Sequence, residues 1–356
     1  MPGNSIGKIF TVTTWGESHG ESSGAVIDGC PPGMKLSAGD IQKGLDLRKP
    51  GSGDSFSSSR KESDTVVILS GVFEGRTTGT PISLIIGNTD AKSGDYEYLR
   101  DVYRPGHGDY TYHKKYGIRD HRGGGRASGR ETAARVAAGA VAKKILESLG
   151  IKVFAYTIEI GGVAAAGFDE NAIEETRLRC PDRISAARME EALEEARIRS
   201  DTVGGIVEIV VKGCPAGLGE PVFDKMDADL AKALMSIGTV KGVEIGAGFR
   251  AARMNGSSMN DPLGPGGFMT NNAGGILAGI TTGESIEIRV ACKAIPSIGI
   301  EQHTTNTAGQ ETVIRVGGRH DVSVIPRIIP VCEAMVAIVI ADHALRQRAC
   351  AGCFYA

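Results

Sequence analysis

Several stretches of the chain alternate hydrophobic and polar residues, which is the pattern of β-strands with one covered face. They predict strands at 8–14, 65–73, 81–87, 152–160, 205–213 and 285–293. Other stretches repeat apolar residues at helical spacing, and they predict helices at 129–149, 185–199, 224–236 and 330–349. Half-covered strands are typical of antiparallel sheets, so the pattern favours an α+β fold of packed sheets and helices over a doubly wound parallel one.

The composition is that of a globular, enzyme-sized chain. Its 356 residues are 41% hydrophobic and carry a formal net charge of -2, which makes nucleic acid an unexpected main partner. No Pro/Ser-rich linker, low-complexity tract or charge block interrupts the sequence, so we predict a single domain over 1–356. A run of about 18 apolar residues and a signal-peptide core are both missing, and we expect a cytoplasmic protein without a membrane partner.

Seven cysteines, an odd number, are scattered along the sequence. Their distribution does not resemble a disulfide framework and indicates reduced thiols. Cys350 and Cys353 have the spacing of a redox or metal motif, but no second pair accompanies them, so no metal site is predicted.

The stretch "HRGGGRASGRETAARVA" at 121–137 combines glycines, arginines and the start of a predicted helix. Ser128 and Glu131 have the spacing of a capping box, which predicts that the helix begins at Gly129. The glycines at 123–125 allow a ligand to approach the backbone, and exposed amides at a helix N-terminus favour an anion. The arginines add fixed charge, so the stretch predicts a phosphate or carboxylate site, with a solvent-facing turn as the alternative; they are Arg122, Arg126 and Arg130.

Histidines are concentrated in the same part of the sequence, at His107, His113 and His121. An imidazole among arginines suits proton donation to a departing phosphate or polarisation of a cofactor carbonyl. For any one of these histidines, a surface or structural role remains open.

A further histidine, His19, lies in "TTWGESHGESSG", where a predicted strand ends in a glycine-rich loop. Polar groups in such loops are often functional. The motif also has some likeness to a nucleophile elbow, which would make Ser18 an esterase nucleophile. The continuation "GESSGAVIDG" predicts a strand instead of the long helix that an elbow requires, so we reject this alternative.

Three separated motifs resemble those of the chorismate synthases in sequence, order and spacing. They are "GESHG" near the start, "RPGHGDYTY" with "YGIRDHRGGGRASGRETAARVAAGA" within 104–140, and "GRHDVSVIPRIIPVCEAM" at 318–335. The resemblance implies a β-α-β sandwich fold, a homotetramer and the 1,4-elimination of phosphate from 5-enolpyruvylshikimate 3-phosphate to give chorismate. It also implies a requirement for reduced FMN without net redox change. Two carboxylates and a phosphate on the substrate, with a further phosphate on the flavin, would account for the arginines.

The same resemblance implies roles for individual residues. His19 would be the acid that assists the leaving phosphate, and His107 would support the anionic reduced flavin. Asp321 would lie on the route by which the C6 proton leaves. Substrate contacts would come from Arg48, Arg60, Arg130 and Arg319. Flavin contacts would come from Arg126, Ala127, Ser128, Gly238, Thr239, Ala278, Lys293, Ala294, Ile295, Pro296, Ser297 and Arg319.

Three places depart from the family pattern. Ala278 replaces a glycine, and "KAIPS" at 293–297 replaces the common "KPTSS". Gly53, Asp54 and Ser55 occupy the place where many relatives carry a second loop arginine, which the family assigns to a nicotinamide cofactor or to substrate phosphate. Because the charge of Asp54 opposes either anion, we predict an enzyme for which NADPH is at most an indirect reductant.

Two alternatives use other features of the sequence. Asp342 and His343 are adjacent on a predicted helix, where consecutive side chains point about 100° apart, so we expect a helix-face or interface role. A non-catalytic phosphate-ligand or RNA-binding protein could use the same arginines. An RNA reader needs stacking aromatics among its basic residues, and here these are limited to Tyr110, Tyr112 and Tyr116.

Overall fold

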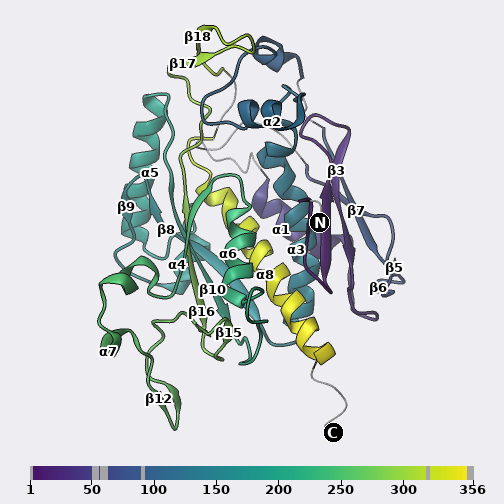
Figure 1. Cartoon of the computed structure of the whole chain (residues 1–356), viewed down its shortest axis with the longest axis vertical. Coiled ribbons are helices and arrows are strands. Elements are labelled where there is room, and N and C mark those ends of the chain that lie inside the picture. The colour runs from purple at the N-terminus through teal and green to yellow at the C-terminus, as the bar shows by residue number, and fades with distance from the viewer. Residues whose placement is uncertain (1–2, 50–55, 57–62, 90–92, 318–320, 351–356) are drawn as a thin grey trace.

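Two antiparallel sheets enclose a layer of helices (Figure 1). We describe a computed structural model of the chain at residues 3–49, 56, 63–89, 93–317 and 321–350. The first sheet has the order β1 (Ser5–Ile6), β2 (Thr11–Trp15), β3 (Ser22–Asp28), β7 (Ile82–Gly87), β4 (Val66–Ile68). The second has the order β11 (Val240–Ile245), β16 (Ile286–Cys292), β10 (Gly205–Lys212), β8 (Lys152–Ile160), β9 (Val163–Ala164).

Small two-stranded hairpins extend from the two sheets, and the helices lie between the sheets or around them. The hairpins are β5 (Val72–Phe73) with β6 (Arg76–Thr77), β12 (Leu263–Gly264) with β13 (Gly267–Phe268), β14 (Ile276–Leu277) with β15 (Ile280–Thr281), and β17 (Gln302–Thr305) with β18 (Glu311–Ile314). The α-helices are α1 (Ala38–Arg48), α2 (Asp109–Tyr116), α3 (Thr132–Glu147), α4 (Glu170–Glu175), α5 (Arg183–Ile198), α6 (Met226–Met235), α7 (Gly256–Met259) and α8 (Ile325–Cys350). The 3-10 helices are η1 (Ser93–Leu99), η2 (Gly125–Ala127), η3 (Gly129–Glu131) and η4 (Gly248–Arg253).

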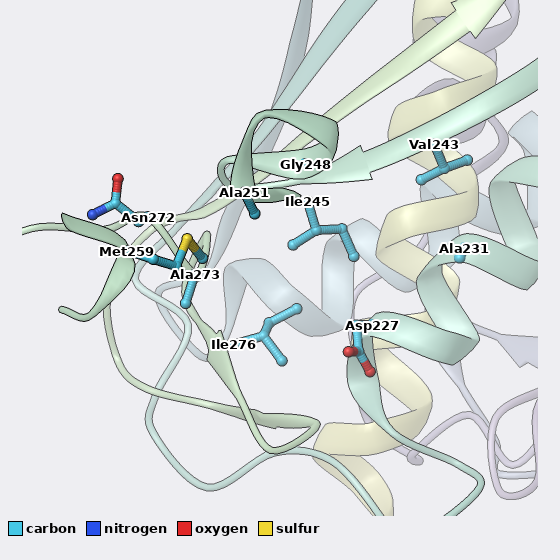
Figure 2. Close-up of a pocket in the computed structure, with 10 residues that line it drawn as sticks. All are labelled: Asp227, Ala231, Val243, Ile245, Gly248, Ala251, Met259, Asn272, Ala273 and Ile276. Atoms are coloured by element: carbon cyan, nitrogen blue, oxygen red, sulfur yellow. The ribbon is translucent and has the colours of Figure 1, made fainter. Parts of the chain in front are cut away.

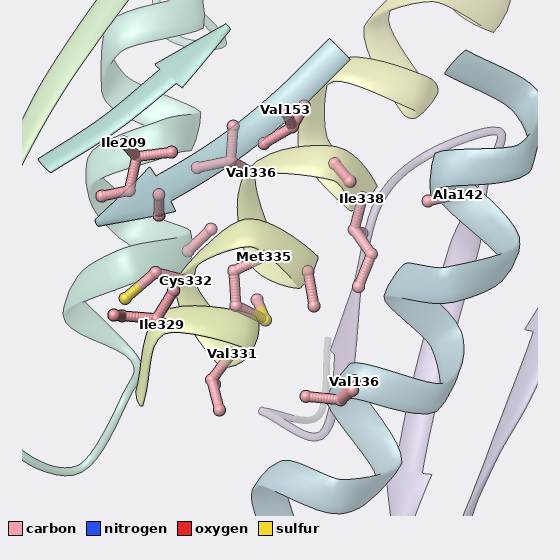
Figure 3. Packing of buried hydrophobic residues seen from close by; sticks show 14 of the residues in the cluster. Val136, Ala142, Val153, Ile209, Ile329, Val331, Cys332, Met335, Val336 and Ile338 are labelled. Carbon is pink, nitrogen blue, oxygen red and sulfur yellow. The ribbon is translucent and has the colours of Figure 1, made fainter. Parts of the chain in front are cut away.

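Helices α3 and α8 form the centre of the hydrophobic core (Figure 3). Helix α3 packs on β3 and β7 of the first sheet, and α8 packs on β8 and β10 of the second. The two helices also pack on each other, so the core is continuous from one sheet to the other. The β-α-β sandwich implied by the family resemblance is therefore confirmed, together with the α+β class.

The middle strands of both sheets agree with the alternating pattern. The strands predicted at 81–87, 152–160, 205–213 and 285–293 are confirmed as β7, β8, β10 and β16. The prediction of one strand at 65–73 is wrong, because β4 ends at Ile68 and the chain then turns at Gly71, which has a φ of 80°, into the separate hairpin that begins with β5. Positive φ of this kind interrupts a strand and suits glycine.

The capping box predicted for Ser128 and Glu131 is wrong. The Ser128 hydroxyl accepts the N–H of Arg130, at 3.3 Å, and the α-helix begins only at Thr132, after a 3-10 turn. Glu131 does not bond back to the cap, because its carboxylate binds the hydroxyl of Thr14 and the guanidinium of Arg135. The tertiary bond to Thr14 and the bond to Arg135 one turn along the helix have replaced the capping bond.

The C-terminal helix begins earlier than predicted, at Ile325, with Pro326 in its first turn and Pro330 inside it. The helix is long and apolar enough to cross a membrane by length and composition, which the sequence analysis did not anticipate. However, 94% of its most apolar window is buried inside the protein. Helix α8 is therefore a core helix, packed against β8 and β10 of the second sheet and against α1, α3 and α6.

Replacing Gly139 on α3 by alanine is expected to lower the free energy of unfolding by about 1–3 kcal/mol. The added Cβ would lie 2.3 Å from the Cβ and 2.5 Å from the Cα of Ala334 on α8. The higher helix propensity of alanine, about 1 kcal/mol, is too small to offset this clash. Gly39→Ala, at an exposed position in the first turn of α1, is the control, because its nearest neighbour is the Ser37 hydroxyl at 3.7 Å. Urea unfolding measures both, and an unchanged Gly139→Ala protein would contradict the packing described.

Candidate active site

His19 lies in a tight turn between β2 and β3. The N–H of Gly20 donates to the carbonyl of Glu17 at 3.2 Å, which closes the turn around His19. The imidazole is buried and meets the ring of Tyr96 edge to face, with 5.0 Å between centroids. A Cβ on Gly123 would lie 2.5 Å from the imidazole Nε2, so only glycine fits beside it. The structure thus brings the glycine-arginine stretch directly against His19.

His107 lies in the loop before α2 and is held at both ring nitrogens. Nδ1 is 2.9 Å from the carbonyl of Pro105, and Nε2 is 2.8 Å from the hydroxyl of Ser297. A carbonyl can only accept, so Nδ1 carries the proton and Nε2 accepts from Ser297 in the neutral imidazole. Burial, reinforced by the positive charge of Arg104, lowers the pKa of His107 to about 4. Arg104 is itself paired with Asp109 at 2.8 Å.

Three of the segments predicted to contact flavin, at 126–128, 238–239 and 293–297, adjoin one another around the His107 loop. In the 293–297 segment, the backbone N–H of Lys293 donates to the carbonyl of Thr239 at 2.9 Å. The ammonium of Lys293 donates to the carbonyl of Gly106, also at 2.9 Å. A Cβ on Gly108 would lie 3.4 Å from the Cβ of Ala127, so the His107 loop also contacts the glycine-arginine stretch. The predicted contacts from 126–128, 239 and 293–297 are therefore brought together around this loop.

Glu131 links these segments, although the sequence analysis gave it only a capping role. Its carboxylate accepts the Thr14 hydroxyl at 2.9 Å and the Arg135 guanidinium at 2.7 Å. The guanidinium of Arg126 donates to the same Thr14 hydroxyl at 2.7 Å. On the other side, Arg135 donates to the hydroxyl of Ser236 at 2.6 Å. One buried carboxylate therefore joins Arg126 to the end of α6.

Arg48 and Arg130 share the fully buried carboxylate of Asp64. Arg48 Nη2 is 2.5 Å from one carboxylate oxygen, and Arg130 Nη1 binds the other. Arg48 also donates to the hydroxyl of Thr132 at 3.2 Å. Burial opposes ionisation of Asp64, but the two guanidiniums outweigh it and lower the pKa of the carboxyl. Two of the four arginines predicted for substrate, Arg48 and Arg130, are thus buried and held by one acid.

Asp321, at the approach to α8, pairs with Arg327, and Arg327 donates to the backbone carbonyl of Arg48 at 3.2 Å. Asp321 therefore lies beside the Arg48 cluster. Predictions for Arg60, Arg319 and the 53–55 loop fall outside the described residues.

Ala278 is not brought to the other predicted flavin contacts. It connects β14 to β15, where the carbonyl of Gly279 accepts the N–H of Met226 at the start of α6. Gly238 and Thr239 follow the opposite end of that helix. An α-helix rises about 1.5 Å per residue, so about 15 Å of α6 separates the two places.

A pocket of about 370 Å³ lies between α6, β11 and the segments after β11 (Figure 2). It is lined by Asp227, Ala231, Val243, Ile245, Gly248, Ala251, Met259, Asn272, Ala273 and Ile276. These lining residues include none of the side chains predicted for the site. The pocket is therefore separate from the cluster around His19 and His107.

Asp342 and His343 have structural contacts. One carboxylate oxygen of Asp342 accepts the backbone N–H groups of residues 8–10, at 3.0, 2.7 and 2.9 Å. His343 Nε2 lies 3.0 Å from a carboxylate oxygen of Asp229 on α6. The helix-face role expected for the pair thus includes holding the segment that precedes β2.

Comparison with known proteins agrees with the arrangement of these motifs. The family model described as chorismate synthase matches residues 10–345. The chain belongs to the chorismate synthase family. It is 66% identical over 352 residues to a chorismate synthase of Syntrophus aciditrophicus, covering 98% of this chain and 99% of the relative. It is 59% identical over 349 residues to one of Desulfosudis oleivorans, with coverage of 98% and 99%.

A solved structure titled "Crystal Structure of Chorismate Synthase" superposes with a TM-score of 0.76 at 32% identity, covering 96% of this chain and 93% of that one. The family's reaction is the last step of the shikimate pathway, in which a lyase eliminates phosphate from 5-enolpyruvylshikimate 3-phosphate to give chorismate. The function and enzyme class expected from the motifs are therefore confirmed. The alternative of a phosphate-ligand or RNA-binding protein is not supported.

His107 is expected to titrate well below the ordinary histidine pKa of about 6.5. As pH falls, the imidazole is protonated in the unfolded chain before it is protonated in the folded protein. Protonation of His107 therefore lowers the free energy of unfolding, increasingly so as pH falls from about 6.5 towards 4. Histidine labelled with 13C at Cε1, with His107→Ala to assign the signal, gives the titration by NMR. A midpoint at or above 6.5 in the ligand-free protein would show that burial and Arg104 do not control this imidazole.

Proposed function

We propose that this chain carries out the family's elimination at the cluster formed by the His19 turn, the His107 loop and the glycine-arginine stretch. One observation carries the proposal: segments far apart in sequence converge so closely that Gly123 has no space for a side chain beside His19. Loops usually run over the surface of a protein. Polar loops that pack this closely against one another are therefore typical of a binding or catalytic site.

The residues around the His107 loop suit reduced FMN. Gly106, Gly123, Gly124 and Gly125 all have positive φ and lack a Cβ, so the backbone can approach a ligand. Thr239 Oγ1 is buried, although its residue is half-buried, and its side chain interacts with the thiol of Cys292, which is a weak hydrogen-bond partner. Together with the guanidinium of Arg126 and the ammonium of Lys293, these groups would hold the cofactor. When bound, reduced FMN supplies an electron-rich ring beside the substrate, with no net redox change over the reaction.

In this proposal, His19 gives a proton to the departing phosphate, and Asp321 lies on the route of the C6 proton. The Arg48–Asp64–Arg130 cluster supplies fixed positive charge for the anionic substrate. His107 has a different starting state, because its lowered pKa leaves it neutral at pH 7. An anion bound beside it would raise that pKa and allow protonation, which is how His107 would support an anionic flavin.

His19→Ala is expected to lower turnover about 10²- to 10⁴-fold, which is the usual contribution of a general acid. The assay is chorismate formation from 5-enolpyruvylshikimate 3-phosphate under anaerobic conditions with photoreduced FMN. His303→Ala on exposed β17 is the matched control and should keep wild-type turnover. A folded His19→Ala protein with near wild-type turnover would remove His19 from the reaction, and a wild-type protein without product would refute the proposed function.

We further propose that NADPH reduces the flavin only indirectly. Purified protein incubated aerobically with NADPH, oxidised FMN and substrate should give no chorismate, whereas photoreduced FMN without oxygen should. The physical reason is the charge of Asp54, which repels nicotinamide phosphates. The control adds a separate flavin reductase to the first mixture under anaerobic conditions, where product should appear. Robust product without the reductase would show that the loop tolerates Asp54.

A single domain, a homotetramer and a cytoplasmic location complete the proposal. The continuous core from Phe10 to Leu345 supports one domain. Several large apolar side chains are exposed, and further copies of the chain could cover them in the proposed tetramer. They include Phe223, Phe249, Leu263 and Met269, which are 90%, 75%, 71% and 74% exposed.

A further inference from the structure

Asn88, which follows β7, lies between the His19 turn and Arg130. Its side-chain nitrogen donates to the carbonyl of Glu17 at 3.1 Å and to the carbonyl of Gly20 at 2.8 Å. Its side-chain oxygen accepts from Nε of Arg130 at 2.6 Å. Because Arg130 can only donate and carbonyls can only accept, this orientation of the amide satisfies every contact, and the flipped orientation satisfies none.

The two carbonyls held by Asn88 are the two ends of the turn that contains His19. The Gly20 N–H already bonds to Glu17, so the turn is closed by one backbone hydrogen bond. The amide of Asn88 then fixes both ends to the C-terminal end of β7. The backbone N–H of Asn88 also donates to the carbonyl of Glu21 at 3.1 Å, which continues the pairing of β3 with β7. The His19 turn is thereby anchored to the first sheet.

Arg130, on the other side of Asn88, is held at every nitrogen of its guanidinium. Nε binds Asn88, Nη2 donates to the carbonyl of Gly87 at 2.8 Å, and Nη1 binds Asp64. The arginine is buried, so it has little freedom to adjust. Asn88 therefore connects the rigidly held guanidinium of Arg130 to the turn that carries His19.

We propose that Asn88 is a positioning residue that fixes the His19 imidazole relative to the Arg48–Asp64–Arg130 cluster. Its role rests on the proposed function, because it matters for the reaction only if His19 gives a proton to phosphate held near these arginines. An acid displaced by about 1 Å from its acceptor loses up to about 100-fold in rate, so holding both groups through one amide has a direct consequence for turnover.

Asn88→Asp separates the two contacts of this side chain, the one with Arg130 and the one with the His19 turn. Its carboxylate keeps an acceptor for Arg130 but faces the Glu17 and Gly20 carbonyls with an oxygen, so the turn loses both donors. We expect the turnover number to fall about 10- to 100-fold, with a change in KM below about threefold. Asn88→Ala removes both contacts and should lower the turnover number and raise KM together.

Asn306→Asp is the matched control. Its side-chain oxygen accepts backbone N–H groups of Ala308 and Gln310 in the exposed β17–β18 turn, at 3.0 and 2.9 Å. This change adds the same charge and also removes an amide donor, which binds the side chain of Gln310 at 2.9 Å. Turnover and KM should stay at wild-type values.

A second readout does not depend on activity. With 13Cε1-labelled histidine, the His19 signal carries a ring-current shift from Tyr96, whose ring lies 5.0 Å away edge to face. Asn88→Asp should move this signal, whereas Asn306→Asp should not; His19→Ala assigns it. If wild-type protein makes no chorismate, the proposed function fails, and the His19 signal alone decides the positioning role.

A wild-type His19 signal and wild-type turnover in folded Asn88→Asp would overturn the proposal. So would an equal loss of turnover in Asn306→Asp, because the effect would then be one of added charge. If Asn88→Asp does not fold but Asn88→Ala does, the signal and kinetics of Asn88→Ala carry the same test: unchanged values refute the role, and a shifted signal with lowered turnover supports it.

Discussion

The close packing of α3 on α8 determines where the charges of the candidate site lie. Gly139 brings the two helices so close that a Cβ there would meet the backbone of Ala334. Since protein cores are close-packed, α3 cannot slide or rotate without opening this contact. The same helix begins at Thr132, immediately after Arg130 and Glu131. Its depth in the core therefore sets the position of both charged groups, which would otherwise depend on a glycine-rich loop.

Buried charge in this site is stable because it is shared. An isolated buried carboxylate would take up a proton, but Asp64 has a guanidinium on each oxygen. Three arginines, Arg48, Arg130 and Arg327, lie with two acids, Asp64 and Asp321, so this group carries an excess of positive charge. The arginines are already oriented by protein partners. A dianionic phosphate would therefore meet a fixed positive field, without the cost of ordering flexible side chains.

The sequence predicted those parts of the fold and site that depend on local pattern or residue type. Strands in the middle of the sheets alternate clearly and were found, whereas α1 was missed because glycines interrupt its few apolar positions. Histidines and arginines could be nominated because their chemistry is distinctive. Their partners could not: Asp64 is 16 residues from Arg48 and 66 from Arg130, and Asn88 is an amide without a motif. Only the fold brings these groups together.

Two departures from the family pattern, Ala278 and the 293–297 segment, lie among the described residues. In "KAIPS", the first and last residues match the family pattern and bond through their side chains, Lys293 to the carbonyl of Gly106 and Ser297 to His107. Ile295, which departs from the pattern, bonds through its backbone carbonyl, which accepts the Thr202 hydroxyl at 2.7 Å. Ala278 differs, because it adopts a φ of 53°, where the glycine of relatives is unstrained. An alanine can hold this conformation at a cost of about 1–2 kcal/mol, so the tight β14–β15 connection persists without the residue that best fits it.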